Sequence, residues 1–300
     1  MTASDRALEG TVIVGVDGSG RDLPAVDWAT DEAASRGSNL QVLHAIRPSR
    51  WPPGQNRPPT VDADETTTAA AERAQARQPR VTVTTRVVGA DPVQALLNVS
   101  VPTSVVVVGA PGRTLTRSVP RQLAARAAGP VVVVRSPPPV PDGPVVVAVD
   151  QAPVALLRFA FAHAARRGLD VRLIHAQARR PRLNFFRVER VQDADAENQA
   201  MAVEKLAAAW TAIYPDVPVD IRQVRLPAVE ALTRAAADAS LVVIGHPDVP
   251  TTRVRPGLAG QELLRQVPVV AVVDAPPERH NRRHQPRRIR TGTPFAQPPT

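Results

Sequence analysis

The sequence predicts an α/β protein with two tandem domains, each a doubly wound, five-stranded parallel sheet. The first observation is that short runs rich in valine and isoleucine alternate with longer amphipathic segments. The runs are too short for helices and lack polar alternation, which is typical of strands buried under helices on both faces. The second observation is that the same elements begin again, in the same order, near residue 145.

Short sequence matches between the two halves keep a nearly constant spacing. VIVGVD, which ends at Asp17, recurs 133 residues later as VVVAVD. The LHA run around His44 recurs as IHA after 131 residues, and VVVVG, which ends at Gly109, recurs as LVVIG after 136. Matches that keep both order and spacing indicate a duplication. We therefore expect the same topology on either side of Pro141, in two separate sheets rather than one continuous sheet.

Glycine, proline and capping residues bound the predicted elements of the first half. A helix over about 24–36 ends at Gly37, a residue type favoured just beyond helix ends. Ser118 is placed to cap a later helix, which ends at Gly129. In chain order we expect strands at 11–17, 40–45, 81–88, 105–108 and 131–134, helices at about 24–36 and 62–78, and shorter helices after residues 90 and 118.

Proline and arginine content marks the expected domain boundaries. Residues 137–144 contain five prolines and predict a stiff linker. The linker separates a first domain at 9–136 from a second domain at 145–275. Residues 276–300 are rich in arginine and proline, so we expect them to form a disordered tail.

Composition excludes several kinds of site. The chain has no cysteine, which excludes disulfides, thiolate metal sites and cysteine nucleophiles. No apolar run approaches the roughly 18 residues that span a bilayer, so we expect a cytoplasmic protein without membrane contact. The net charge of +9 includes +5 from six Arg and one Glu in residues 276–300, so it does not indicate specific nucleic-acid recognition. The single lysine, Lys205, lies outside any GxxxxGK run, which excludes a P-loop.

The stretch from Ser104 to Arg135 carries the clearest candidate site. A valine strand runs into Gly109 and Gly112, which permit backbone shapes that a Cβ forbids, and a helix follows Ser118. A glycine loop and a helix N-terminus at the carboxyl end of a parallel strand are suited to a phosphate group.

Several motifs resemble the universal stress protein family. In the first half they are VIVGVDGS with the WATDEAASRG helix, LHA, GADPVQALL, and VVVGAPG followed by SV and LAARAAGPVVVVR. The resemblance covers about 9–136 and 143–275, and it implies a Rossmann-like fold in each half. It also implies an internal pseudo-dimer, with the closing strands Val131–Arg135 and Val269–Val273 at or near the contact. Whether two chains also form a homodimer is left open.

The same resemblance implies that the protein binds an adenine nucleotide such as ATP, with no metal required. The nucleotide would lie across the carboxyl ends of the strands. Asp17 and the backbone of Ala45 would contact the adenosine, and Gly109, Gly112 and Ser118 would hold the phosphates.

The phosphate segment departs from the family pattern. Four residues separate Gly112 from Arg117, where the family has nine before a glycine. Arg113 and Arg117 could contact phosphate through their side chains instead. In the second half, Asp248 stands at the position of Gly112 and adds a negative charge, and Leu258 replaces the family's Ser or Thr. We therefore predict a degraded nucleotide site, better retained in the first domain than in the second.

The resemblance implies a stress-response protein. No residue is an evident activator of water, so we predict that the protein is non-catalytic. The alternative is a nucleotide-free scaffold that docks a partner through the Arg-rich loop at 178–190 and the tail. Asp17 could also simply cap the turn after its strand, and structural roles are favoured for His44 and His175.

Overall fold

A computed structural model describes residues 10–47, 61–110, 118–149, 154–176, 189–245 and 258–273. The first half has the elements β1 (Val12–Val16), α2 (Leu23–Arg36), β2 (Leu40–Ala45), α3 (Val61–Arg77), β3 (Val83–Val88), α4 (Pro92–Val99), β4 (Val105–Gly109), α5 (Val119–Ala124) and β5 (Val131–Val134). The second half has β6 (Val145–Ala148), α6 (Val154–Arg167), β7 (Val171–Ala176), α7 (Glu189–Ile213), β8 (Val219–Val224), α8 (Ala228–Ala235), β9 (Leu241–Ile244), α9 (Leu258–Gln266) and β10 (Val269–Val272). The predicted alternation of strands and helices is confirmed in both halves.

The strand order repeats between the halves. The sheet runs β3-β2-β1-β4-β5-β10-β9-β6-β7-β8, and the pairs within each half are parallel. Read outward from the centre, both halves therefore follow the same doubly wound path. This repeat confirms two five-stranded parallel units with one topology, as the duplication predicts.

The expectation of two separate sheets is wrong. β5 and β10 pair antiparallel, with Val131 opposite Val272 and Val134 opposite Val269, and this pair joins the halves into one ten-stranded sheet. Both closing strands are apolar and fully buried. An apolar strand with an unpaired edge gains hydrogen bonds and burial from a partner, so the two edges satisfy each other. The predicted position of the closing strands, at the contact between the halves, is confirmed.

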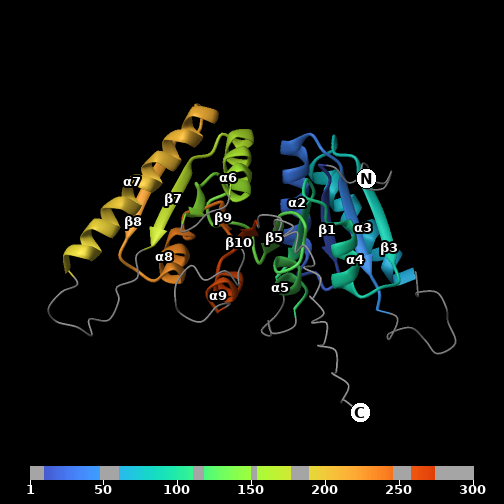
Figure 1. Ribbon diagram of the computed structural model, residues 1–300. Helices are drawn as coiled ribbons and strands as arrows, with labels where there is room; N and C mark the ends of the chain where they lie inside the picture. The colour runs from blue at the N-terminus through green and yellow to red at the C-terminus, as the bar shows by residue number, and fades with distance from the viewer. Residues whose placement is uncertain are drawn as a thin grey trace, which may run out of the picture.

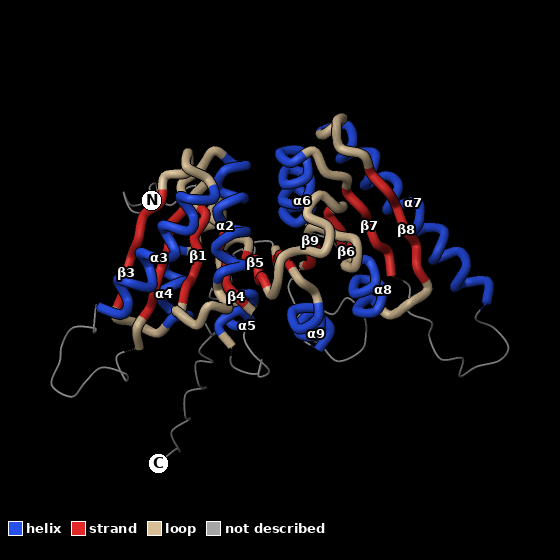
Figure 2. Tube along the Cα trace, turned by 180° about the vertical axis from the view of Figure 1, so that it is seen from behind, coloured by secondary structure: helices blue, strands red, loops and turns tan. Residues whose placement is uncertain are grey.

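Helices cover both faces of the sheet (Figure 1). One core cluster lies under α2, α3, α6 and α7, and the other under α4, α5, α8 and α9. Each cluster contains residues from both halves, so the core is continuous across the boundary. Figures 1 and 2 both show α2 and α6 side by side on one side of the β5–β10 pair and α5 and α9 on the other.

Local sequence explains where the helices begin and end. Gly37 has a left-handed φ of 61° and its N–H closes the last turn of α2, as expected. Asp91 caps α4 by accepting a hydrogen bond from the Val93 N–H at 3.0 Å, and Pro92 follows at the first helical position. Among the helices that the structure describes, none combines enough length with enough apolar character to cross a membrane.

Candidate functional site: a pocket at the strand ends of the first half

A pocket of about 690 Å³ opens at the carboxyl ends of β1, β2 and β4. β1 and β4 are neighbours in the sheet, and the chain path reverses between them, which is where open α/β sheets place their ligands. The residues that line the pocket include four of the predicted site residues: Asp17, Ala45, Gly109 and Ser118. The other three, Gly112, Arg113 and Arg117, lie outside the described residues.

The loop after β1 is held by Asp22, which the sequence analysis missed. Its Oδ2 accepts hydrogen bonds from the N–H groups of Asp17 at 2.9 Å and Gly18 at 3.2 Å, and the residue is only 7% exposed. Asp22 lies just before the start of α2 at Leu23, where aspartate commonly bonds to nearby backbone. That position was the signal from which its role could have been found.

Asp17 lines the pocket and is an exposed residue. Its Oδ1 accepts a hydrogen bond from the Ser19 N–H at 2.9 Å, so the carboxylate does cap its own turn. Oδ2 makes no hydrogen bond or ion pair to the described residues. One carboxylate oxygen thus organises the turn, and the other makes no contact with the described part of the chain that would keep it from a ligand.

The structure explains the glycine at position 109 without any ligand. A Cβ at this position would lie 3.0 Å from the Arg21 carbonyl oxygen and 3.3 Å from the Asp22 Cα. Both are backbone atoms that a side-chain rotation cannot move. The loop after β1 therefore packs directly onto the end of β4, and this close contact favours glycine.

Ser118 is the N-cap residue of α5, but the expected side-chain cap is not formed. Its Oγ is buried and has no hydrogen-bond partner among the described residues. A buried hydroxyl without a partner is unusual, because the lost solvation is not compensated. Ser118 therefore brings an unsatisfied polar atom to the wall of the pocket.

The end of β2 contributes His44, Ala45 and Arg47 to the lining. His44 Nδ1 is buried and lacks a hydrogen-bond partner within the described part of the chain. Arg47 Nε donates to Asp91 Oδ2 at 3.0 Å, which fixes the cation at the rim. Burial alone would raise the pKa of Asp91, but the hydrogen bonds from Arg47 and from the Val93 N–H outweigh it and lower that pKa. Sequence reasoning missed this pair, although an aspartate directly before a proline signals an N-cap.

Among the described lining residues, acidic and basic groups are equal in number. Two carboxylates, Asp17 and Asp22, and two guanidinium groups, Arg21 and Arg47, line it. Within the described ranges, no group of three histidine, aspartate or glutamate side chains could hold a metal ion. Hydrogen bonding and shape therefore dominate the described lining, which suits an uncharged, hydrogen-bonding moiety such as a nucleoside.

Other predicted features fall where the structure gives no description. In the second half these are Asp248 and Asp150, the aspartate that ends the VVVAVD run, so the stronger erosion of that site stays a prediction. The tail and all but the last two residues of the Arg-rich loop at 178–190 also lie outside the described ranges.

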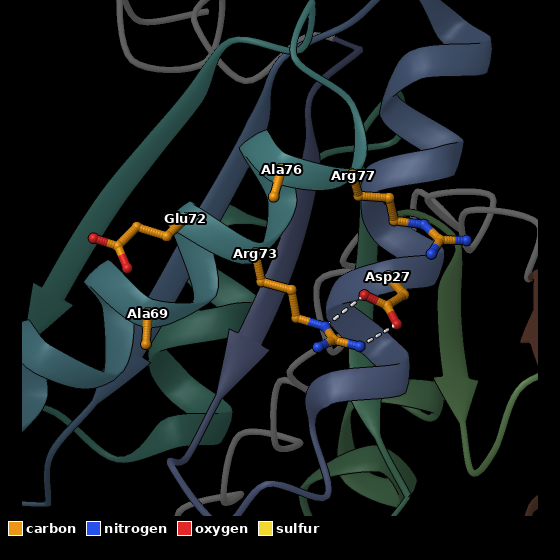
Figure 3. A pocket seen from close by; sticks show the side chains of 6 residues that line it. All are labelled: Asp27, Ala69, Glu72, Arg73, Ala76 and Arg77. Carbon is orange, nitrogen blue, oxygen red and sulfur yellow. Dashed lines mark hydrogen bonds and ion pairs between the residues drawn. The ribbon is translucent and has the colours of Figure 1, made fainter.

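A second, shallower pocket of about 590 Å³ lies between α2 and α3 (Figure 3). Arg73 points from α3 to Asp27 on α2, and two hydrogen bonds of 2.6 Å join the pair. Arg77 makes the equivalent pair with Asp31, at 2.7 and 2.8 Å. The arginines on this surface are therefore already used by protein carboxylates, and the pocket is far less suited to a ligand than the one at the strand ends.

The repeated topology and the pocket at the switch point define a duplicated Rossmann-like α/β protein. The sequence pattern of the universal stress protein family matches residues 10–135 and, a second time, residues 143–273. The chain belongs to this family, in its tandem-domain form, as the sequence resemblance indicated.

Two relatives agree with this assignment. Universal stress protein Rv2005c of Mycobacterium tuberculosis is 32% identical over 264 residues, which cover 78% of this chain and 86% of the relative. Universal stress protein Rv1996 of the same organism is 30% identical over 274 residues, covering 78% and 84%. The crystal structure of a universal stress protein from Archaeoglobus fulgidus shares the fold, with a TM-score of 0.62 and 16% identity over 90% of this chain and 98% of that chain. A universal stress protein solved in complex with cAMP is 29% identical and covers 42% of this chain and 97% of its own, with a TM-score of 0.36.

Proposed function

We propose that this protein is a non-catalytic stress-response protein whose first half binds an adenine nucleotide, such as ATP, in the pocket at the carboxyl ends of β1, β2 and β4. The observation that carries the proposal is the meeting of Asp17, Ala45, Gly109 and Ser118 around one pocket. These positions come from four separate segments of the chain. The pocket's volume of about 690 Å³ lies within the range of pockets that hold small ligands and cofactors.

The residues present fit the nucleoside part of such a ligand. The Asp17 carboxylate can accept hydrogen bonds from an exocyclic amine or a ribose hydroxyl, and the backbone at Ala45 lies at the same wall. The Ser118 hydroxyl, which lacks a protein partner, is the described group best placed to serve a phosphate. The charges of the described lining residues balance, so these residues supply little net attraction for a triphosphate. We therefore expect weak binding, in the micromolar to millimolar range (about −8 to −4 kcal/mol).

Isothermal titration of the full-length chain tests the proposal. Adenosine, AMP, cAMP and ATP are the ligands, with GTP as a control for the base. Asp17→Asn keeps an oxygen for the Ser19 N–H but removes the charge, and we expect it to weaken adenine-nucleotide binding about tenfold, or about 1.4 kcal/mol. Asp27→Asn is the matched control, because Asp27 pairs with Arg73 outside this pocket.

Two outcomes would overturn parts of the proposal. If millimolar ATP gives no heat of binding and no thermal shift, the protein does not bind the nucleotide. That result would favour a scaffold that docks a partner through its Arg-rich segments. Phosphate release above a buffer blank, lost in Asp17→Asn, would show that the protein is a hydrolase rather than non-catalytic.

A further inference from the structure

A buried carboxylate lies at the boundary between the halves. Glu32, on α2, is 0% exposed, and its Oε2 is 2.8 Å from Nδ1 of His163 on α6, which is 1% exposed. Its Oε1 accepts hydrogen bonds from Arg36 Nε at 2.5 Å and from Arg166 Nη2 at 3.1 Å. One carboxylate of the first half therefore satisfies an imidazole and a guanidinium of the second.

Glu32 and His163 occupy the same position in the two copies. α2 and α6 both have 14 residues, and each is followed by a glycine with positive φ, Gly37 at 61° and Gly168 at 64°. Aligning the helices at these ends places Glu32 on His163. Because equivalent positions touch, a local pseudo-twofold axis passes between these two side chains.

The closing strands obey the same symmetry but do not distinguish the halves. Val131 lies opposite Val272 and Val134 opposite Val269, so the register is unchanged when the two strands exchange roles. The sequences VVVV and VVAV differ only by one alanine in place of a valine, and both are wholly apolar. A pairing of β5 with β5 of another chain would bury almost the same surface. Strand pairing therefore supplies contact area and no choice of partner.

The helices next to these strands do distinguish them. If two first halves met at this surface, two buried Glu32 carboxylates would face each other. If two second halves met, two His163 rings would meet with Arg166 from each side and no equivalent of Glu32. Buried like charges are unfavourable, and a complementary pair is satisfied only between unlike halves. Such rejection of wrong partners is a general source of specificity.

We propose that Glu32 and His163, with Arg36 and Arg166, make the first half select a second half, and not another first half, as its partner at this surface. Two further contacts around this pair also join residues of different type from the two halves. Trp28 stacks on the His163 ring at 5.9 Å, and Arg36 lies over the Phe159 ring at 5.7 Å.

A second contact across the boundary agrees with this division of roles. Arg135, directly after β5, donates from Nη2 to the Leu264 carbonyl oxygen near the end of α9, at 3.0 Å. Its backbone N–H donates to the Pro268 carbonyl oxygen at 2.8 Å. In the symmetry-related position after β10 stands Val273, which has no side-chain donor. The boundary has thus diverged at two places from a contact between identical partners.

Exchanging the two residues in the full-length chain tests the proposal. The variants are Glu32→His, His163→Glu and the double variant that carries both. Each single variant places two like residues across the boundary, whereas the double variant restores one carboxylate and one imidazole. Asp27→Asn, on the same helix but in a pair with Arg73 within the first half, is the control. If a single variant does not fold, Glu32→Gln replaces it in the series.

Two measurements on each variant separate partner choice from general stability. Amide hydrogen exchange follows the N–H of Arg135 and those of β5 and β10 against those of β1 and β2. Light scattering after size exclusion follows mass against concentration. We expect each single variant to speed exchange at the boundary at least tenfold relative to β1 and β2 and to show more concentration-dependent association than the wild-type chain.

The double variant decides the outcome. We expect it to recover more than half of the lost protection, on a logarithmic scale, and to return to the wild-type mass. Recovery should be incomplete, because Arg166 has Ser35 as its counterpart on α2. If the effects of the two single exchanges simply add in the double variant, or if protection is lost equally in β1 and β2, the proposal is wrong.

Discussion

Replacing Glu32 by glutamine tests how much the buried network contributes to stability. The change keeps the shape of the side chain and removes its charge, while Arg36, Arg166 and His163 stay in place around it. Removing one member of a buried ion pair typically costs about 3–5 kcal/mol, because the remaining charge is left uncompensated. We expect Glu32→Gln to lower the free energy of unfolding by that amount. The exposed pair of Asp27 with Arg73 sets the comparison, and Asp27→Asn should cost less than about 1 kcal/mol.

Urea denaturation of the full-length chain, followed by circular dichroism, measures both variants. If Glu32→Gln loses no more than the Asp27→Asn control, then the network only offsets its own desolvation. In that case burial and hydrogen bonding of Glu32 add no net stability.

The same variant has a predicted pH dependence. Burial alone would raise the pKa of Glu32, but His163, Arg36 and Arg166 outweigh burial and lower it below its ordinary value of 4.5. A carboxyl with a lowered pKa in the folded state stabilises fully above its unfolded pKa, and the contribution is lost as the pH falls toward the folded pKa. Wild-type stability should therefore drop as the pH falls below 4.5, and the drop should be smaller in Glu32→Gln. Parallel curves for the two proteins would contradict this assignment.

Substitutions at four further positions have expected costs that follow from single contacts. Asp22→Ala removes the acceptor for two backbone N–H groups and should lower the free energy of unfolding, measured in urea, by about 1–3 kcal/mol. The same variant should bind adenine nucleotides more weakly in calorimetric titration. Asp22→Asn should lose less stability and less affinity. Gly129→Ala places a Cβ 2.3 Å from the Val101 carbonyl oxygen, whereas Gly109→Ala places a Cβ 3.0 Å from the Arg21 carbonyl oxygen. The urea denaturation midpoint should therefore fall more in Gly129→Ala than in Gly109→Ala. Phe161 is fully buried, and its ring centroid lies 5.4 Å from that of Trp210. Phe161→Ala leaves a cavity there and should lower the free energy of unfolding by about 3–5 kcal/mol, followed by tryptophan fluorescence. Equal midpoints for the two glycine variants, or a Phe161→Ala loss below about 1 kcal/mol, would contradict the packing described.

The sequence predicts the elements and their order well, because each strand carries its signal locally. Runs such as Val105–Val108 are apolar at every position, and this pattern alone indicates burial on both faces. The joining of the two sheets was not predictable in the same way. A valine run reads the same whether its free edge meets a helix, solvent or another valine run, so β5 gives no local sign of its pairing with β10.

The candidate site was predictable where it depends on strand ends. Asp17, Ala45, Gly109 and Ser118 each follow a strand or begin a helix, and the parallel topology brings such positions together. The role of Asp22 was missed because its side chain bonds backward to the loop instead of capping the helix ahead.

Glu32 shows where local patterns stop being informative. In the sequence it is a charged residue within a helix whose apolar face includes Trp28 and Ala33, and an exposed position is the natural expectation. Its burial depends on His163, which lies 131 residues away in the chain. Only the three-dimensional meeting of the halves reveals this pair.

The outer strands, β3 and β8, are the ends of the sheet in the described part of the chain. Side chains of Thr84, Thr85 and Arg86 on β3, and of Arg222 and Gln223 on β8, are exposed. An incoming strand would have to strip water from these polar groups, which discourages the end-to-end stacking that leads to fibrils. Because the two copies are joined in one polypeptide, the apolar edges of β5 and β10 are paired with each other at the centre of the sheet. The edges that remain at its two ends carry polar, hydrated side chains.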